Sequence, residues 1–340
     1  ELTLDVGQQI IFAGDAITFT GLSSAEFNTS RIRLLADTDI EVSGDLNLIF
    51  TDVDAGRAVD FNVVAGGSIA MQRATKTALS EAAETHYNKM TFKAEDEIDW
   101  NSALTLNSGS LALTSSTSRV VFKPLTEIDL SGTTTSRFDD DLATDGGRLS
   151  VAALQDIEFQ TPASNQQISI DVSAATGANA GSISLTSQTG NVSIANASIT
   201  ANSQLAQRAG DLNITTALKT SADFEQLLYL VNEEGLSNQV YYRVGDGDIS
   251  MANTQRLKSH SATLVADAGN IIINGTIDAL GDRPYIGLFA SDDLTLSNTA
   301  DISLSQTGDN QYQTSLLELS SFSGNVNILD GHELSAISEA

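Results

Sequence analysis

The sequence contains no cysteine and only three prolines among its 340 residues. Without thiols it can form no disulfides, no cysteine-based metal site and no thiol nucleophile. The scarcity of proline argues against a Pro-rich linker or stalk. Aromatic residues make up 6% of the chain, whereas hydrophobic residues make up 41%. A core must therefore be built mainly from Val, Ile, Leu and Ala.

Basic residues are also scarce, because 17 Lys and Arg stand against 44 Asp and Glu, a formal net charge of −27 at pH 7. Such a field repels phosphate backbones, so we expect no nucleic-acid partner. No apolar run approaches the roughly 20 residues of a membrane-spanning helix, so we expect a chain that does not span a membrane. The chain opens at Glu1 without a signal peptide. Because the strand pattern runs to both ends, we expect a processed product or a segment of a longer protein.

One short motif is abundant: Gly, then usually Asp, Asn or Ser, then an apolar residue, any residue and another apolar residue. It predicts a tight turn followed by a half-buried strand. Strands of the same alternation without the Gly, such as Asp96-Glu97-Ile98-Asp99-Trp100, lie between the copies. The Gly motif occurs at residues 44–48, 67–71, 109–113, 147–151, 181–185, 190–194, 210–214, 247–251, 269–273 and 324–328.

The spacing of the Gly motif predicts the fold. The modal step is about 20–23 residues, with two or three short strands in each unit, which suits one coil of a parallel β-helix. A β-sandwich would use fewer and longer strands. We therefore predict an all-β parallel β-helix (β-solenoid) that forms a single repeat domain over residues 1–340.

Two stretches interrupt the alternation of apolar and polar residues. Residues 74–89 are rich in helix formers, so they are expected to form a short helix or an excursion from the coil stack. Residues 223–235 have apolar side chains at 224, 227, 228 and 231, which is helical spacing, and Gly235 fits a helix stop. We expect both to be insertions on one side of a rod, although a loop that merely strays is an alternative.

The polar residue after each Gly has a predicted structural role. Asn and Ser side chains can bond to the turn backbone and to the next coil, whereas stacked carboxylates repel one another and would make the rod sensitive to cations. We expect these residues to align near one corner of the stack. They are Asp45, Ser68, Ser110, Asn191, Asp211, Asp248 and Asn270.

The sharpest candidate site is an acidic cluster, Asp139-Asp140-Asp141 with Asp145 before two glycines. Hard cations such as Ca²⁺ prefer several oxygens from a flexible loop, so these four residues are a candidate Ca²⁺ site; the alternative is an exposed acidic turn with no ion. No other cofactor is expected. His86, His260 and His332 are far apart in sequence and are expected to be surface residues.

A family resemblance is clearest over residues 166–214. This segment runs through Gly181-Ser182-Ile183-Ser184-Leu185 and Gly190-Asn191-Val192-Ser193-Ile194 to Gly210-Asp211-Leu212-Asn213-Ile214. It resembles the β-helical shafts of large bacterial surface proteins of the filamentous-haemagglutinin type, which include two-partner-secreted exoproteins and autotransporter passengers. The resemblance implies a right-handed helix, export, and an extracellular or cell-surface location on a Gram-negative-type bacterium. The Asn-Pro-Asn-Gly turns of that family's secretion domain are absent, which implies a shaft segment.

These observations predict a non-enzymatic structural protein, a rod-like segment of an exported adhesin, fibre or sheath. It would display or assemble at the cell surface, with like subunits or host or cell-surface glycans as partners, and could form a homopolymer or filament. The alternative is an extracellular polysaccharide-binding or polysaccharide-cleaving β-helix. That alternative predicts aromatic and acidic residues converging on one face, near Trp100, Tyr285 or Tyr312.

Overall fold

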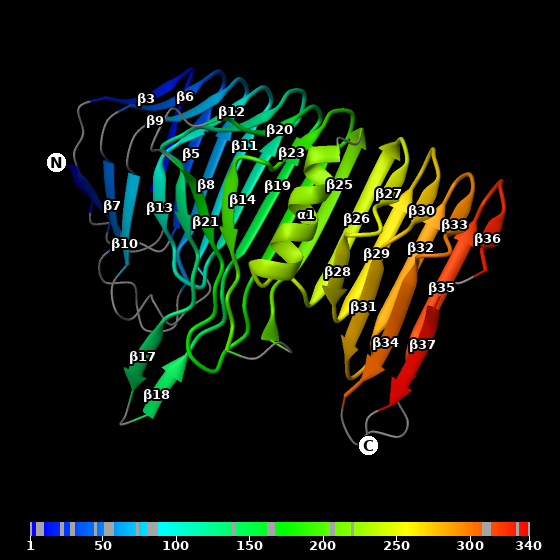
Figure 1. Ribbon diagram of the computed structural model, residues 1–340. Coiled ribbons are helices and arrows are strands. Elements are labelled where there is room, and N and C mark those ends of the chain that lie inside the picture. The colour runs from blue at the N-terminus through cyan, green and yellow to red at the C-terminus, as the bar shows by residue number, and fades with distance from the viewer. Residues whose placement is uncertain are drawn as a thin grey trace.

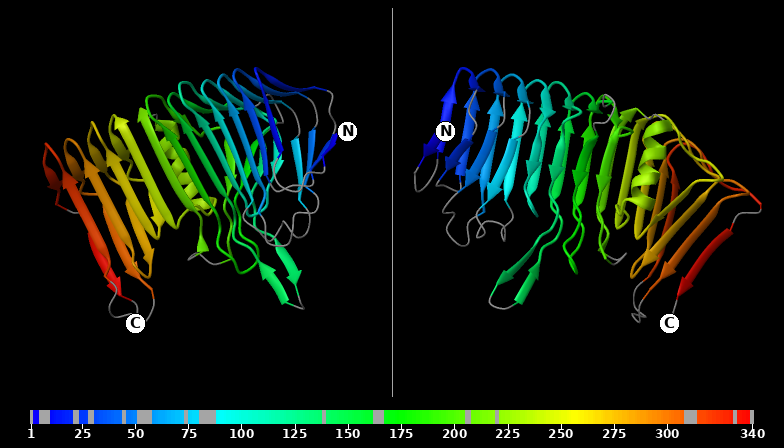
Figure 2. Two further views of the ribbon diagram at one scale, coloured as in Figure 1. Left: turned by 180° about the vertical axis from the view of Figure 1, so that it is seen from behind. Right: turned by 60° about the vertical axis from the view of Figure 1, so that its left-hand side comes forward.

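The computed structural model describes residues 2–4, 10–20, 24–27, 31–43, 46–50, 58–72, 75–79, 88–137, 140–161, 167–204, 208–218, 221–307, 314–330 and 333–338. Over these residues the chain is a parallel β-helix. Successive strands run along three long faces, and most pair in parallel with their equivalent one turn later. Figures 1 and 2 show the resulting rod of stacked rungs, with the two termini at opposite ends.

The first face is a single sheet that runs the whole length of the rod, with 12 strands in the described residues. Along the axis they are β2 (Ile10–Gly14), β5 (Arg31–Ala36), β8 (Asp60–Ala65), β11 (Lys89–Ala94), β14 (Ser110–Ser115), β19 (Arg148–Ala153), β22 (Ser182–Ser187), β25 (Asp211–Leu218), β26 (Gln239–Asp246), β29 (Ser261–Ala266), β32 (Tyr285–Ala290) and β35 (Leu316–Ser321).

The second face consists of two sheets that follow one another along the axis. The N-terminal one contains β3 (Ile17–Thr20), β6 (Ile40–Ser43), β9 (Ile69–Gln72), β12 (Ile98–Asn101), β15 (Val120–Phe122), β20 (Ile157–Phe159) and β23 (Val192–Ser193). The C-terminal one contains β27 (Ile249–Met251), β30 (Ile271–Ile273), β33 (Leu294–Leu296) and β36 (Val326–Ile328).

The third face is divided further. Its first sheet contains β1 (Leu2–Leu4), β4 (Ser24–Phe27), β7 (Leu46–Phe50) and β10 (Thr75–Leu79). Its second contains β13 (Ala103–Thr105), β16 (Glu127–Asp129), β21 (Ile168–Asp171) and β24 (Ala197–Thr200). After the helix α1 (Ser221–Glu233), a third sheet contains β28 (Arg256–Ser259), β31 (Thr276–Gly281), β34 (Asp301–Gln306) and β37 (Glu333–Ser338).

The shortest turns of the helix confirm the predicted coil length. Leu257 pairs with Ile277, Met90 with Leu111 and Val240 with Ala262, so one rung takes 20 to 22 residues. Longer turns carry most of their extra residues between the third face and the next strand of the first face. The antiparallel hairpin of β17 (Thr134–Arg137) and β18 (Asp140–Ala143) is one such insertion, and it projects from this edge of the rod (Figures 1 and 2).

The Gly motif occurs at more than one corner, so the prediction of a single corner is wrong. Ser68 and Asn191 precede strands of the second face, whereas Ser110 and Asp211 begin strands of the first face; Asp45 lies outside the described residues. The nine-residue step from Gly181 to Gly190 therefore separates two successive faces of one turn and does not mark a short coil.

The core is a continuous column of inward-pointing side chains, because alternate strand residues point inward. Along β14 and β19 the burial alternates strictly, and Leu111 and Leu149 are fully buried and paired in register. Each fully buried aliphatic side chain contributes about 1.5–3 kcal/mol. Aromatic residues add to the predicted aliphatic core: the rings of Phe122 and Phe159, on adjacent rungs, stack with centroids 4.5 Å apart.

Helix α1 takes the place of both the second-face and the third-face strand in its turn, between β25 and β26, and confirms the helical spacing of residues 223–235 (Figure 1). Phe224, Leu227 and Leu230 are buried in the rod interior. Gly235, with φ 82°, follows the helix, and the amide of Leu236 donates to the carbonyl of Leu230. The left-handed conformation favours glycine here and ends the helix.

The first third-face strand after the helix, β28, would present an unpaired backbone edge toward α1. The carboxamide of Asn232, in the last turn of α1, covers that edge. Its Nδ2 donates to the carbonyl of Arg256 over 2.6 Å, and its Oδ1 accepts the amide of Lys258 over 3.0 Å. One side chain thus replaces a peptide unit of the missing neighbouring strand, which protects the edge from pairing with other chains.

Residues 74–89 are only partly described. Thr75–Leu79 forms β10, which pairs in parallel with β7, so the predicted helix is wrong for this part. Residues 80–87 lie outside the described residues.

Candidate functional site: the rung ladders and the exposed end of the rod

The predicted Ca²⁺ cluster lies at the projecting hairpin and the turn that follows it. Asp140 and Asp141 belong to β18, and in the backbone register of the hairpin they lie opposite Arg137 and Ser136 of β17. Asp139 lies outside the described residues. Asp145 Oδ1 accepts the Asn179 amide over 2.9 Å, so it joins two rungs. Among the described residues no three His, Asp or Glu side chains form a potential metal-binding group. The four-residue cation site stays a prediction.

Side-chain carboxylates at the corner before the second face link one rung to the next. Asp39 Oδ1 accepts the amide of Ser68 over 2.7 Å, and Asp156 Oδ1 accepts the amide of Asn191 over 2.7 Å. Both acceptors precede strands that lack the Gly motif, and both donors follow its Gly. In the sequence, an Asp directly before an alternating strand indicates such an acceptor. The backbone amide that it accepts cannot be identified without the pairing register of the strands.

The same ladder is continuous in the C-terminal half. Asp248 Oδ1 accepts the Asn270 amide over 2.7 Å, Asn270 Oδ1 accepts the Asp293 amide over 2.9 Å, and Asp293 Oδ1 accepts the Asn325 amide over 2.7 Å. Asp and Asn alternate along it, so no two carboxylates are adjacent in these four rungs. The predicted repulsion between stacked carboxylates is thereby avoided.

The ladder also explains why the motif begins with Gly. A Cβ at Gly190 would touch Asp156 Oδ1 and lie 2.6 Å from the carbonyl carbon of Gln155 on the preceding rung. A Cβ at Gly324 would meet Asp293 Oδ1 in the same way. The accepting carboxylate occupies the space that any other residue would need.

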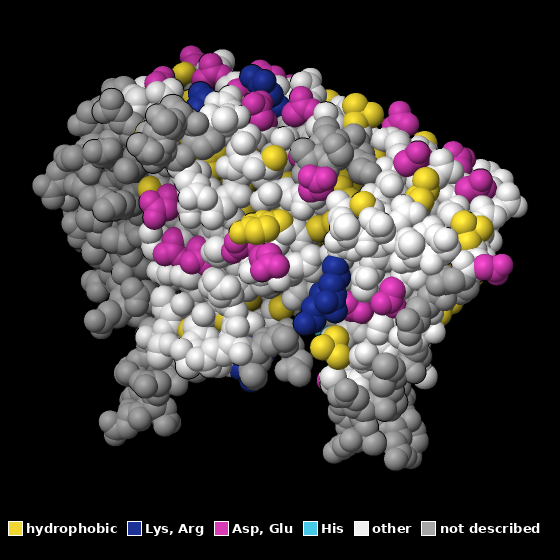
Figure 3. Space-filling model, viewed as in Figure 1, with side chains coloured by type: hydrophobic (Ala, Val, Ile, Leu, Met, Phe, Trp, Pro, Cys, Tyr) yellow, Lys and Arg dark blue, Asp and Glu magenta, His cyan; other side chains and the backbone are white. Residues whose placement is uncertain are grey.

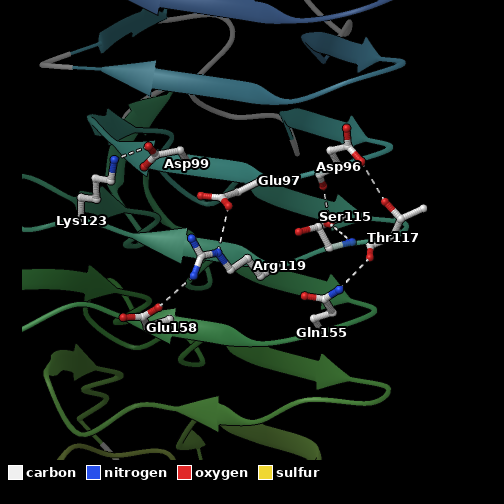
Figure 4. Close-up of polar contacts among 10 residues, drawn as sticks. Asp96, Glu97, Asp99, Ser115, Thr117, Arg119, Lys123, Gln155 and Glu158 are labelled. Atoms are coloured by element: carbon white, nitrogen blue, oxygen red, sulfur yellow. Dashed lines mark hydrogen bonds and ion pairs between the residues drawn. The ribbon is translucent and has the colours of Figure 1, made fainter.

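Arg119 replaces the acidic or amide residue at this corner in one rung (Figure 4). Its Nε donates to Glu97 Oε2 over 2.9 Å, and its Nη1 lies 3.9 Å from Glu158 Oε2. The hydrogen bond and the charge of Glu97 raise the pKa of Arg119, so the guanidinium stays charged. It neutralises carboxylates on the rungs before and after it.

Further bonds on the same surface connect the same rungs (Figure 4). Lys123 pairs with Asp99. Thr117 Oγ1 donates to Asp96 Oδ1 over 3.0 Å, and Gln155 Nε2 donates to the Thr117 carbonyl over 3.3 Å. Each contact crosses from one rung to the next and satisfies polar groups of the rod itself, so this cluster fixes the register of the stack.

The C-terminal rung exposes side chains whose equivalents in the three preceding rungs point into the core. Val326, Ile328 and Leu334 are 43%, 44% and 42% exposed. Their register partners Leu294, Leu296 and Ile302, one rung earlier, are fully buried. We call these three exposed residues the end surface. Nothing in the sequence distinguishes them, because their alternation is that of a buried rung.

The aromatic residues suggested as sugar platforms are differently placed. Trp100 is a core residue. Its ring packs edge to face on the ring of Phe92, with centroids 5.0 Å apart, and its Nε1 donates to the Ser102 carbonyl. It therefore cannot present a face to a glycan. Tyr285 begins β32 and its hydroxyl donates to Glu318 over 3.2 Å. Tyr312 lies outside the described residues, as do His86 and His332.

In the described part of the chain, no helix is both long enough and apolar enough to cross a membrane.

Comparison with known proteins gives no relative. No protein-family model matches the sequence, and no match was found among the curated proteins or among the solved structures.

Proposed function

We propose that this chain is a non-enzymatic structural protein, a rod-like segment of an exported adhesin, fibre or sheath that is displayed or assembles at a cell surface. The observation that supports the proposal is the end surface. Val326, Ile328 and Leu334 have the orientation of core residues but no rung above them among the described residues. A further rung would cover them, contributed by a second molecule or by residues that follow in a longer chain.

The free energies of burial and of immobilisation favour end-to-end stacking that uses backbone and side chains together. Covering the three partly exposed side chains contributes about 1–2 kcal/mol each. Immobilising a second molecule costs about 4–15 kcal/mol. The unpaired backbone edges of β35, β36 and β37 must supply the remainder. Asn325 extends the corner ladder to the last rung. Its side chain holds the same ladder position as that of Asn270, whose Oδ1 accepts an amide of the following rung.

Net charge opposes this contact. At −27, two copies repel one another over about 10 Å at 0.1 M salt. We therefore expect end-to-end association to strengthen as ionic strength rises. Acidic side chains are scattered over the face seen in Figure 3, where basic ones are few.

The experiment is sedimentation velocity of the 340-residue chain over a range of concentrations at low and high salt, with electron microscopy of the same samples. We expect concentration-dependent species that are multiples of the rod length. Ile328→Asp places a charge in the end surface and should abolish them. Leu125→Asp is the matched control, because Leu125 is similarly exposed (47%) but lies on the side of the rod.

The proposal fails if the chain stays monomeric under all conditions, or if Leu125→Asp and Ile328→Asp weaken association equally. For the location, antibody labelling of intact cells should detect the protein without permeabilisation; labelling that requires permeabilisation would contradict surface display.

A further inference from the structure

Outward-pointing aromatic side chains gather at one place on the first face of the rod. From β2 to β25, no outward position of the described strands of this face carries an aromatic residue. Further along, Tyr241 lies on β26, and Tyr285 and Phe289 lie on β32. Other aromatic side chains, such as Trp100 and Phe122, are in the core. The outward cluster therefore has no part in packing the rod interior.

The rings of Tyr285 and Phe289 lean toward each other along β32. Ile286 and Leu288 are fully buried, so residues 285, 287 and 289 are the outward positions of the strand. A Cβ on Gly287 would lie 2.5 Å from Tyr285 Oη and 2.7 Å from Phe289 Cε2, so the two rings meet above the glycine. Both side chains are half-buried, which leaves part of each ring open to solvent. We call Tyr285, Gly287 and Phe289 the aromatic platform.

A carboxylate lies directly beside the platform. Glu318 of β35 is the register partner of Gly287 on the neighbouring strand (Figure 1), and its Oε2 accepts the Tyr285 hydroxyl over 3.2 Å. Burial and this hydrogen bond raise the pKa of Tyr285, so the phenol stays protonated and donates. Glu318 is exposed, and its remaining lone pairs can accept further hydroxyl groups.

Aromatic rings beside a carboxylate suit the ring of a sugar. A pyranose presents C–H groups over its ring faces and hydroxyls around its rim. Aromatic faces carry partial negative charge, which attracts the weakly positive C–H groups, and a carboxylate is a strong acceptor for the hydroxyls at the rim. Glu318 holds the Tyr285 phenol in place, and the two rings meet over Gly287. The site therefore loses little side-chain entropy on binding.

Charge opposes two other occupants of the platform. An anionic polymer would meet Glu318 and the net charge of −27. A second copy of the chain that docked through the same patch would bring two Glu318 side chains into one contact, because a two-fold interface joins identical surfaces. Burying such like charges together is costly. A neutral glycan avoids both penalties and supplies hydroxyl donors to the carboxylate.

We propose that the aromatic platform binds a neutral glycan, with the C–H faces of its pyranose rings on Tyr285 and Phe289 and a hydroxyl on Glu318. This binding goes beyond the structural role argued above. The platform points out from the side of the rod, so it stays open whether or not a further rung covers the end surface.

The test is titration calorimetry and saturation-transfer NMR of the 340-residue chain with neutral hexasaccharides of glucose, mannose and galactose. A galacturonate hexamer is the anionic probe. At least one neutral hexasaccharide should bind saturably, with transfer to its ring C–H protons, and the galacturonate hexamer should bind at least about tenfold more weakly. Absence of binding by every neutral probe would overturn the proposal. Equal or tighter binding of the galacturonate hexamer would also overturn it.

Gly287→Ala tests the geometry while both rings are kept. The new methyl group would displace the outer ends of Tyr285 and Phe289, which are free to move into solvent. The thermal midpoint should hardly change, while glycan binding should weaken about tenfold. Phe289→Ala removes one ring from an outward position and should weaken binding by a similar factor.

Tyr229→Ala is the matched control. Tyr229 is also an exposed tyrosine (49%) whose hydroxyl donates to a glutamate, Glu234, over 2.7 Å, but it stands on α1, so its loss should leave binding unchanged. An equal loss in Tyr229→Ala, or no loss in both Gly287→Ala and Phe289→Ala, would place the glycan elsewhere and overturn the proposal. Loss of self-association in Phe289→Ala, measured by sedimentation velocity, would overturn it too, because the patch would then be a contact between copies.

Discussion

At the scale of single residues, two partners on successive rungs set the register of the rod. A carboxylate or carboxamide on one rung accepts an amide of the next, as Asp156 does from Asn191. The glycine before that amide, Gly190, leaves the space that the carboxylate occupies. A strand that slipped by one residue would lose the bond and also turn its apolar side chains outward.

Gly190→Ala should lower the free energy of unfolding by about 1–3 kcal/mol, the usual result of overpacking. The new methyl group would collide with Asp156 and with the Gln155 carbonyl carbon. Urea unfolding followed by circular dichroism measures the change. Gly14→Ala is the control, because a Cβ there meets only the Ala16 carbonyl oxygen at 3.6 Å, and its effect should stay within about 0.5 kcal/mol. Equal effects at the two glycines would refute the steric explanation.

The sequence predicts well which residues point inward, because the period-2 alternation of Ile98 and Trp100 is itself the strand signal. It could not assign the Gly motif to faces. The same five-residue motif begins β14 on the first face and β9 on the second, and only the lengths of the intervening turns distinguish the two copies.

At the scale of elements, α1 shows how a helix is accommodated in a stack of strands. Phe224 of α1 packs on Tyr242 of β26, with ring centroids 5.4 Å apart. Burial raises the pKa of Tyr242 well above its ordinary value, and the charge of Asp223 adds to the effect. The Tyr242 hydroxyl has no hydrogen-bond partner among the described residues.

This contact predicts a loss of stability in alkali. Below pH about 10, the ordinary tyrosine pKa, Tyr242 is neutral in both states and adds no pH dependence. Above it, the unfolded state releases the proton while the folded state keeps it, so the free energy of unfolding falls by up to about 1.4 kcal/mol per pH unit. Tyr242→Phe should remove this part of the decline between pH 9 and pH 11, measured by urea unfolding at both values.

Tyr241→Phe is the control for that measurement, because Tyr241 is the less buried neighbour on the same strand. It should retain the decline of the original chain. An identical decline in Tyr242→Phe and in the original chain would show that other groups cause the alkaline loss.

The two interruptions of the strand pattern differ in how far the sequence could predict them. Residues 223–235 have apolar side chains at helical spacing and a glycine stop, and α1 forms at Ser221–Glu233. In residues 74–89, helix formers suggest a helix, but Thr75–Leu79 pairs with β7. Pairing with the edge of β7 outweighs the weak local preference of these residues for a helix. The sequence does not predict the β17–β18 hairpin, because the acidic residues of this segment indicate a cation-binding loop instead.

At the scale of the whole molecule, each rung is stabilised by the rungs on both sides of it. The last described rung has one such neighbour, which leaves the end surface exposed. We expect amides of β36 to exchange with deuterium faster than those of β30 in dilute solution, measured by mass spectrometry of peptides. Concentration and salt should slow exchange in the strands of the last rung, β35, β36 and β37, and leave β30 unchanged. Uniform exchange along the rod, insensitive to concentration, would contradict stacking at this end.

The chain on either side of α1 shares one uninterrupted sheet. The second face stops at β23 and resumes at β27, and the third face stops at β24 and resumes at β28, while β25 and β26 remain paired. Tension along the rod is therefore carried at this joint by one ladder of backbone hydrogen bonds and the side chains of the helix, where the other joints of the described residues have two or three ladders in parallel. The joint is the compliant point of the shaft, at which it bends or parts first when pulled.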